Sequence, residues 1–233
     1  MMNKKDISIP IEILTVASFF LMIITNLFAP AAFAFSIWGL IYMLLAGYIF
    51  YQLGLFQSKI NNAEEAFSNK IRVAFIISSF ANSLWLVAWH NLQIALSMVF
   101  IIIIFICLGY IFHIISKYRF SFDKRIFAKI PFSVYFAWIT VAMIANFAVL
   151  AVSRQWHNLF FVESTWTIIL ILFGLVLGSF VAYRYKDAVY GMVLVWAYSG
   201  ILIKHMSENG FNRQYPMIIF TVIGSLALLI LLV

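Results

Sequence analysis

Residues 33–52, FAFSIWGLIYMLLAGYIFYQ, form a continuous run without a single charged side chain. A helix needs roughly 20 apolar residues to cross the hydrocarbon core of a bilayer, because each residue adds about 1.5 Å. This run is therefore long enough for one membrane span. Trp38 and Tyr42 lie inside it, four residues apart and so on one face of a helix. Trp and Tyr usually mark the water-facing ends of a span, so two rings inside the run need a separate explanation.

The whole chain has the composition of a membrane protein. Of its 233 residues, 65% are hydrophobic and 10% are charged, whereas a soluble domain carries about 25% charged residues. Eight apolar runs fill the sequence, at about 9–29, 33–56, 71–89, 92–116, 131–152, 165–183, 188–204 and 216–233. We therefore expect an all-α fold, a polytopic membrane bundle of about eight transmembrane helices.

The positive charges alternate between the segments that connect these runs. If the N-terminus is cytoplasmic, 12 of the 15 Lys and Arg residues fall on the inner side and 3 on the outer side. Cytoplasmic loops carry such an excess of Lys and Arg in membrane proteins. The pattern predicts an integral protein of a bacterial or archaeal cell membrane with both termini in the cytoplasm. Since topology accounts for the net charge of +7, we expect no nucleic-acid partner.

Motifs for enzymatic chemistry are missing from the sequence. There is no HExxH motif, no Gly-rich phosphate loop and no plausible Ser/His/Asp grouping, so we expect no catalytic residues and no metal site. No carboxylate falls near the middle of a run, which argues against an ion-coupled carrier. Lys204, His205 and Glu208 predict an ion pair at the outer rim. Four acidic residues are interpreted as solvated loop charges: Glu64, Glu65, Asp123 and Asp187.

Two asparagines interrupt otherwise apolar runs. An unpaired amide in lipid costs several kcal/mol, so Asn82 and Asn146 should face the interior of the bundle. At about 1.5 Å per residue, they share the outer half of the bundle with Trp38, Tyr42 and Trp85. These side chains either satisfy one another in a packed core or line a cavity for a flat, mostly apolar ligand. Spacing alone favours neither interpretation.

Three motifs resemble those of a known family. FAFSIWGLIYMLLAG resembles the second-helix signature of the tryptophan-rich sensory protein family, the bacterial relatives of the translocator protein (peripheral benzodiazepine receptor). Phe35, Trp38 and Tyr42 occupy its Phe, Trp and Tyr positions. ANSLWLVAWH resembles the third helix of that family, with Asn82 and Trp85 on its Asn-x-x-Trp.

IPFSVYFAWITVAMIANFAVL resembles the fifth helix of the same family, with Pro131, Trp138 and Asn146 on its Pro, Trp and Asn. The resemblance covers residues 9–153. It implies a five-helix bundle whose cavity binds a porphyrin such as haem, a sterol-like lipid or a similar flat molecule. The ligand-binding positions would be Trp38, Tyr42, Asn82, Trp85, Trp138 and Asn146.

The chain also departs from the five-helix pattern. The long first loop of the family shrinks to APAA around Pro30, and Phe147 replaces a Tyr that often follows the fifth-helix Asn. We expect residues 1–153 to form the five-helix core. Residues 154–233 would add three transmembrane helices to the same membrane domain, as in an extended eight-helix form of the superfamily. Gly174 and Gly178 form a GxxxG motif that allows close helix packing, either within the chain or in a homodimer.

These features favour a receptor-like or sensor-like membrane protein that binds a flat hydrophobic ligand and contacts membrane lipids. The alternative is a carrier or permease for small apolar or amphipathic molecules. An intramembrane enzyme acting on a lipid or tetrapyrrole is the weakest hypothesis, because the carboxylates for acid–base catalysis are missing.

The charge pattern generates a prediction about topology. A reporter fused after Val233 should show cytoplasmic activity, and a cysteine introduced at Asn158 should react with an impermeant thiol reagent added from outside. Cells expressing the fusion provide both measurements, and Cys107→Ser supplies a background without the native thiol. An external C-terminus would contradict the count of eight spans.

Overall fold

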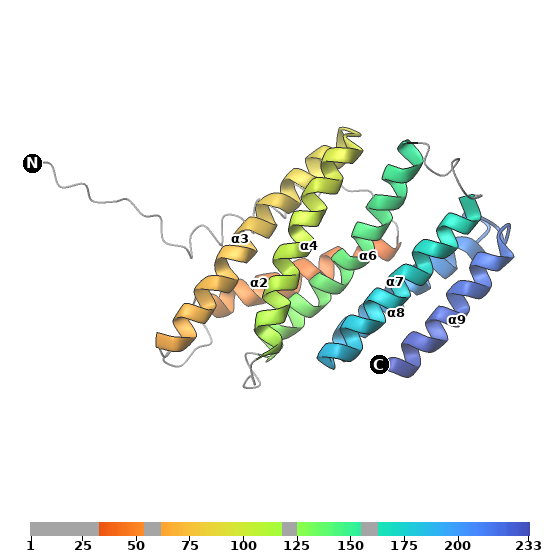
Figure 1. The fold of residues 1–233 in the computed structure, drawn as a ribbon. Coiled ribbons are helices and arrows are strands. Elements are labelled where there is room, and N and C mark those ends of the chain that lie inside the picture. Colours follow the sequence, from red (N-terminus) through yellow and green to blue (C-terminus); the bar gives the residue numbers. More distant parts are fainter. Residues whose placement is uncertain (1–32, 54–61, 118–124, 155–162) are drawn as a thin grey trace, which may run out of the picture.

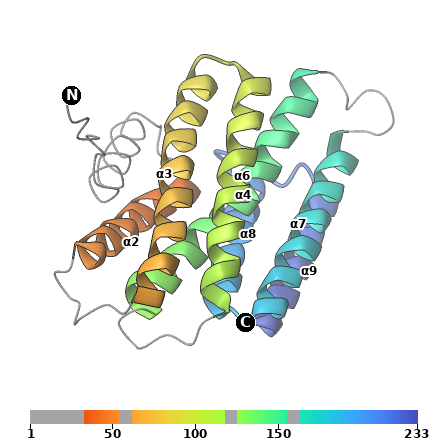
Figure 2. The same cartoon turned by 60° about the vertical axis from the view of Figure 1, so that its left-hand side comes forward.

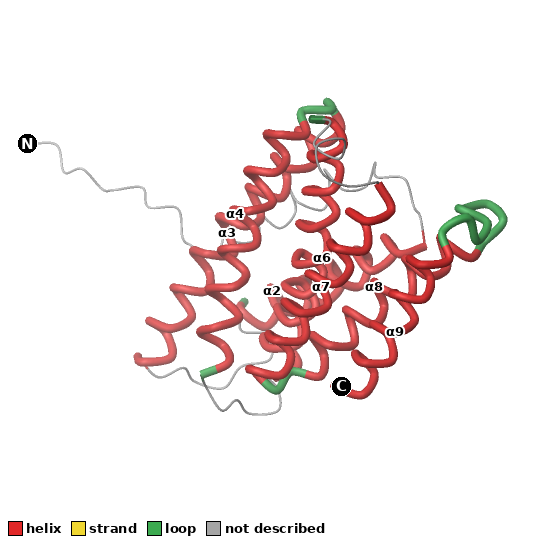
Figure 3. The backbone as a smooth tube through the Cα atoms, turned by 45° about the vertical axis from the view of Figure 1, so that its right-hand side comes forward, coloured by secondary structure: helices red, strands yellow, loops and turns green. Residues whose placement is uncertain are grey.

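The computed structural model of the chain describes residues 33–53, 62–117, 125–154 and 163–233 (Figure 1). Within these ranges the chain is helical and contains no strand (Figure 3), which confirms the predicted all-α class. The elements are the 3₁₀ turn η1 (Phe33–Ser36), the helices α2 (Ile37–Gln52), α3 (Asn62–His90) and α4 (Ile94–Ser116), the π-helical turn η2 (Arg125–Lys129), and the helices α6 (Ile130–Ser153), α7 (Glu163–Tyr185), α8 (Ala188–Met206) and α9 (Pro216–Leu232). The predicted span 9–29 lies outside the described residues.

Six of the described helices are long and apolar enough to cross a membrane, and α9 is a shorter apolar helix. They match the predicted runs to within a few residues, apart from the start of α3. That helix begins at Asn62, nine residues before the predicted run. Its first turns, NAEEAFSNK, are too polar to belong to an apolar span, but Ala, Glu and Lys are strong helix formers. The part of α3 that is apolar enough to cross a membrane begins at Asn69.

The helices alternate in direction from α3 onward. Only residues 91–93 connect α3 to α4, and the two helices run antiparallel side by side (Figures 1 and 2), as so short a link requires. Helix α6 lies at the centre and packs against α2, α4, α7 and α8. Helix α2 is strongly inclined to α3 (Figure 2). It packs on α6, but its backbone does not pack closely on that of α3.

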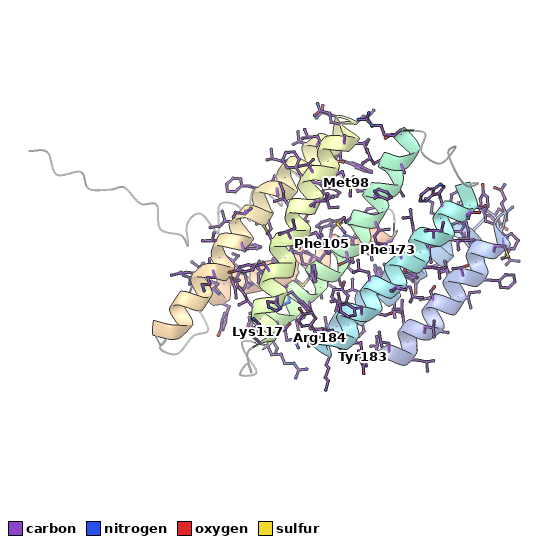
Figure 4. All side chains as sticks on the ribbon, viewed as in Figure 1. Met98, Phe105, Lys117, Phe173, Tyr183 and Arg184 are labelled. Carbon is purple, nitrogen blue, oxygen red and sulfur yellow. The ribbon has the colours of Figure 1, made fainter. Side chains whose placement is uncertain are left out.

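Basic side chains gather at one end of the bundle. Lys117 at the end of α4 and Arg184 at the end of α7 lie at this same end (Figure 4). Helix α6 begins there as well, directly after Lys129 of η2. The arrangement agrees with the predicted alternation of charged segments, and the orientation of this end in the membrane stays a prediction.

The glycines of the GxxxG motif face another helix of the same chain. A Cβ atom added to Gly178 would lie 2.5 Å from a methyl carbon of Leu194, and one added to Gly174 would lie 2.9 Å from the Tyr198 hydroxyl. Both partners belong to α8. These two glycines therefore let α7 approach side chains of α8 closely.

Asp187 was predicted to be a solvated loop charge, and the structure shows that this prediction was wrong. The link between α7 and α8 is only two residues long, and it turns this carboxylate inward to an exposure of 4%. Oδ1 accepts a hydrogen bond from the Tyr190 backbone N–H at 3.0 Å, which caps α8. Oδ2 accepts one from the Ser133 hydroxyl at 2.8 Å and lies 3.5 Å from the Lys129 ammonium. The carboxylate thus fastens the start of α8 to the start of α6.

Replacing Asp187 by Ala should lower the free energy of unfolding by about 2–3 kcal/mol, because it removes a helix cap and leaves two partners unpaired. Denaturation of the purified protein in detergent provides the measurement. Glu208→Ala, at an exposed acidic position, is the control and should change stability by less than about 0.5 kcal/mol. Equal stability of the two variants would show that the carboxylate does not fasten the helices.

Candidate functional site

Five aromatic side chains meet where α2, α3 and α6 converge. The Trp38 ring stacks on the rings of Tyr42 and Trp85, with centroid distances of 5.6 and 6.0 Å and interplanar angles of 26° and 30°. It also makes edge contacts with Tyr135 at 6.0 Å and Trp138 at 6.4 Å. We call these five residues the aromatic cluster.

The cluster lies in the interior of the bundle. Trp38, Trp85, Tyr135 and Trp138 are buried, and Tyr42 is partly buried. The interior position predicted for Trp38 and Tyr42 is confirmed. Their helix-face spacing explains the geometry, since residues three or four apart share one face, and α2 and α6 each supply such a pair to the cluster.

Tyr135 is a member of the cluster that the sequence interpretation missed. Its side chain is fully buried, and it precedes Trp138 by three residues on α6. That spacing was the available signal, because it places both rings on the helix face that meets Trp38.

Asn146 has its hydrogen bonds inside the protein. Its Oδ1 accepts one from the Trp85 indole Nε1 at 2.9 Å, and its amide is 3.2 Å from the Ser97 hydroxyl. The Nδ2 atom lies 3.7 Å from the Met98 sulfur. These partners come from α3 and α4, so the Asn146 amide joins three helices.

Asn82 is equally buried, with an exposure of 0%, but neither its Oδ1 nor its Nδ2 has a hydrogen-bond partner among the described residues. The same holds for the Tyr42 hydroxyl and the Trp138 indole N–H. The Tyr42 hydroxyl lies near Asn82, outside the geometry of a hydrogen bond. Each such group costs about 1–3 kcal/mol when it is buried without a partner.

The two predicted asparagines therefore differ in hydrogen bonding, although both lie beside the same rings. The six predicted residues lie on α2, α3 and α6 and come together in the structure: Trp38, Tyr42, Asn82, Trp85, Trp138 and Asn146. The hydrogen bonds of Asn146 are made with α3 and α4. The groups with unused hydrogen-bonding capacity are Tyr42, Asn82 and Trp138. They provide three donors and an amide oxygen next to stacked rings. In the described ranges, no three His, Cys, Asp or Glu residues lie together as a metal site would need.

The fold and the six apolar helices define an integral membrane protein of the helical-bundle class. The sequence model of the TSPO-like protein family matches residues 4–233, so the chain belongs to this family. The match confirms the resemblance seen in residues 9–153 and extends it through α7, α8 and α9. No curated protein and no solved structure matches the chain.

Asn146→Leu should lower the free energy of unfolding by about 2–3 kcal/mol, because it leaves the Trp85 N–H and the Ser97 hydroxyl buried with fewer partners. Thermal denaturation in detergent measures the effect. Ser153→Ala, at an exposed position near the end of the same helix, is the control and should leave stability within about 0.5 kcal/mol of the native value. A stable Asn146→Leu variant would contradict the proposed joint between α3, α4 and α6.

Proposed function

We propose that this TSPO-like protein binds a flat, mostly apolar ligand at the aromatic cluster and acts as a receptor or sensor for it. The observation that carries the proposal is the buried Asn82 amide, which has no hydrogen-bond partner among the described residues. Buried polar groups are nearly always paired, so each exception needs an explanation, and a bound ligand that supplies the partner is one.

The shape of the site supports a planar ligand. Trp38 lies within 30° of parallel to both Tyr42 and Trp85, so these rings present flat faces on which another flat molecule can stack. The backbones of α2 and α3 do not pack closely, and the contact between these helices is made by large side chains. Rearranging a few rings would therefore admit a ligand without breaking a close helix–helix contact.

The polar groups define the chemistry of the ligand further. The Tyr42 hydroxyl, the Asn82 amide and the Trp138 indole N–H can all donate hydrogen bonds. The ligand should carry at least one oxygen or nitrogen acceptor at its edge. A porphyrin such as haem or protoporphyrin combines a flat apolar ring with carboxylates, and it is the ligand class that the resemblance to tryptophan-rich sensory proteins also implies.

Titration with protoporphyrin should quench the intrinsic fluorescence saturably, because Trp38, Trp85 and Trp138 lie beside the proposed site. Asn82→Leu should weaken binding about tenfold, the effect of one lost hydrogen bond in a buried site. The same variant should keep or raise the thermal stability of the ligand-free protein, since it removes an unpaired buried amide. An amide with only a structural role would instead give lower stability and unchanged affinity.

Asn91→Leu supplies the matched control. It makes the same substitution directly after the end of α3, at an exposed position where the amide donates only to the Val87 carbonyl, and should leave affinity unchanged and stability within about 0.5 kcal/mol of the native value. Free tryptophan in the same micelles corrects for quenching that does not require the site. Quenching of the native protein without saturation, or native affinity in Asn82→Leu, would refute the proposal.

A further inference from the structure

A second site candidate lies on the other side of α6. A partly open cavity of about 350 Å³ is lined by residues of α6, α7, α8, α9 and the α8–α9 connection. Ligand-binding cavities have volumes of about 300–1,000 Å³, so this one is large enough for a small ligand. None of its lining residues belongs to the aromatic cluster.

Most of the cavity wall is apolar. Val141 and Ile144 of α6, Ile171 of α7 and Ile218 of α9 contribute aliphatic side chains. These aliphatic side chains suit a hydrocarbon chain, and the hydroxyl side chains of Ser164 and Thr167 on α7 add polar groups to the lining.

One side of the cavity has a closely packed wall. A Cβ atom added to Gly174 would come within 2.9 Å of the Tyr198 hydroxyl and 3.2 Å of Ile144 Cδ1, so α7 approaches these two side chains closely at this glycine. The Tyr198 hydroxyl donates a hydrogen bond to the Ile171 carbonyl, which holds this ring against α7. The cavity therefore has a defined wall on this side.

The end of the cavity formed by the last turn of α8 is polar. His205 lines it with an exposure of only 6%, and its Nδ1 has no hydrogen-bond partner among the described residues. The imidazole stacks on Phe211 at 4.7 Å, and the Lys204 ammonium lies 5.2 Å from the centre of the same Phe211 ring. The Phe211 ring thus contacts both the Lys204 ammonium and the His205 imidazole.

Lys204 does not form the ion pair that the sequence predicted at the outer rim. Within the part of the chain that the structure describes, Glu208 is exposed and forms no ion pair with Lys204 or His205. The α8–α9 connection instead folds back so that the backbone N–H of Phe211 donates to the Lys204 carbonyl at 3.0 Å. This turn places Phe211, rather than a carboxylate, beside the two basic side chains.

We propose that this cavity is a second binding site, for an amphipathic anion whose hydrocarbon chain lies among the α6 and α7 side chains and whose carboxylate or phosphate contacts Lys204 and His205. The aliphatic wall would take up the chain, and the ammonium and imidazole N–H would donate to the anionic head. A free fatty acid and an anionic phospholipid share this chemistry. The site is independent of the function proposed for the aromatic cluster.

Photocrosslinking tests the site in the full chain. The protein is placed in phosphatidylcholine nanodiscs with a long-chain fatty acid that carries a diazirine at its methyl end, and the adducts are mapped by mass spectrometry. We expect saturable labelling of α6 and α7 at the cavity wall. Unlabelled fatty acid and phosphatidylglycerol are each tested as competitors, and the one that competes more strongly identifies the source of the anion. The corresponding neutral alcohol should not compete.

Two substitutions change the head-binding end while preserving its packing. Lys204→Met keeps the aliphatic stem, and His205→Phe keeps the stacking on Phe211. Each should weaken competition by the anion about tenfold, the effect of one lost charge-assisted hydrogen bond. Ala148→Phe, which fills the cavity from α6, should abolish the saturable labelling. This variant keeps the proposal testable if Lys204→Met or His205→Phe fails to fold.

Controls separate this site from the lipid-facing surface and from the aromatic cluster. Lys117→Met removes an exposed lysine at the basic end of the bundle, and Asn82→Leu changes the cluster. Both should label as the native protein does. Labelling spread without saturation over all helices, equal competition by the neutral alcohol, or native labelling of Ala148→Phe would each overturn the proposal.

Discussion

The constraint on which this structure depends is that a polar group inside a membrane bundle must find its partner within the protein. The described helices meet it in two ways. Serines bond back to their own helix, as Ser79 does to the Phe75 carbonyl at 2.9 Å. Larger polar groups join different helices, as Asn146 does with Trp85 and Ser97. Where so many groups are satisfied, a fully buried amide without a partner needs an explanation, and binding supplies one.

The sequence was sufficient to predict the helices but only part of the site. Apolar runs of sufficient length predict spans because the bilayer sets the length and excludes other structures. The spacing of Trp38 and Tyr42, together with the depth of their run, also predicted that both rings face inward. Which asparagine is paired could not be predicted, since the Ser97 partner of Asn146 is 49 residues away and meets it only when α4 packs on α6. Asp187 was misjudged for a related reason. Its burial depends on where a two-residue link places α8 against α6, which local composition does not encode.

Helix α6 organises the bundle because one of its faces contributes to the aromatic cluster and another lines the cavity. Trp138 contacts Trp38 of α2 and completes the aromatic cluster, and Asn146 accepts a hydrogen bond from Trp85 of α3. Val141 and Ile144 line the cavity shared with α7, α8 and α9. The spacing of these residues along α6 separates the two sets on different faces, as a helix of 3.6 residues per turn requires.

This division also explains why the three C-terminal helices are more than an addition to a five-helix core. Helix α8 is fastened to the start of α6 through Asp187 and Ser133, and its Trp196 indole donates to the Ala34 carbonyl of η1 at 3.3 Å. The C-terminal helices thus contact both α6 and the segment that leads into α2. They cover a face of α6 that would otherwise have no partner in these helices, and the match of the family model to residues 4–233 includes them. Because no residue of α6 belongs to both the aromatic cluster and the cavity, substitutions at one site can alter its ligand without changing the wall of the other.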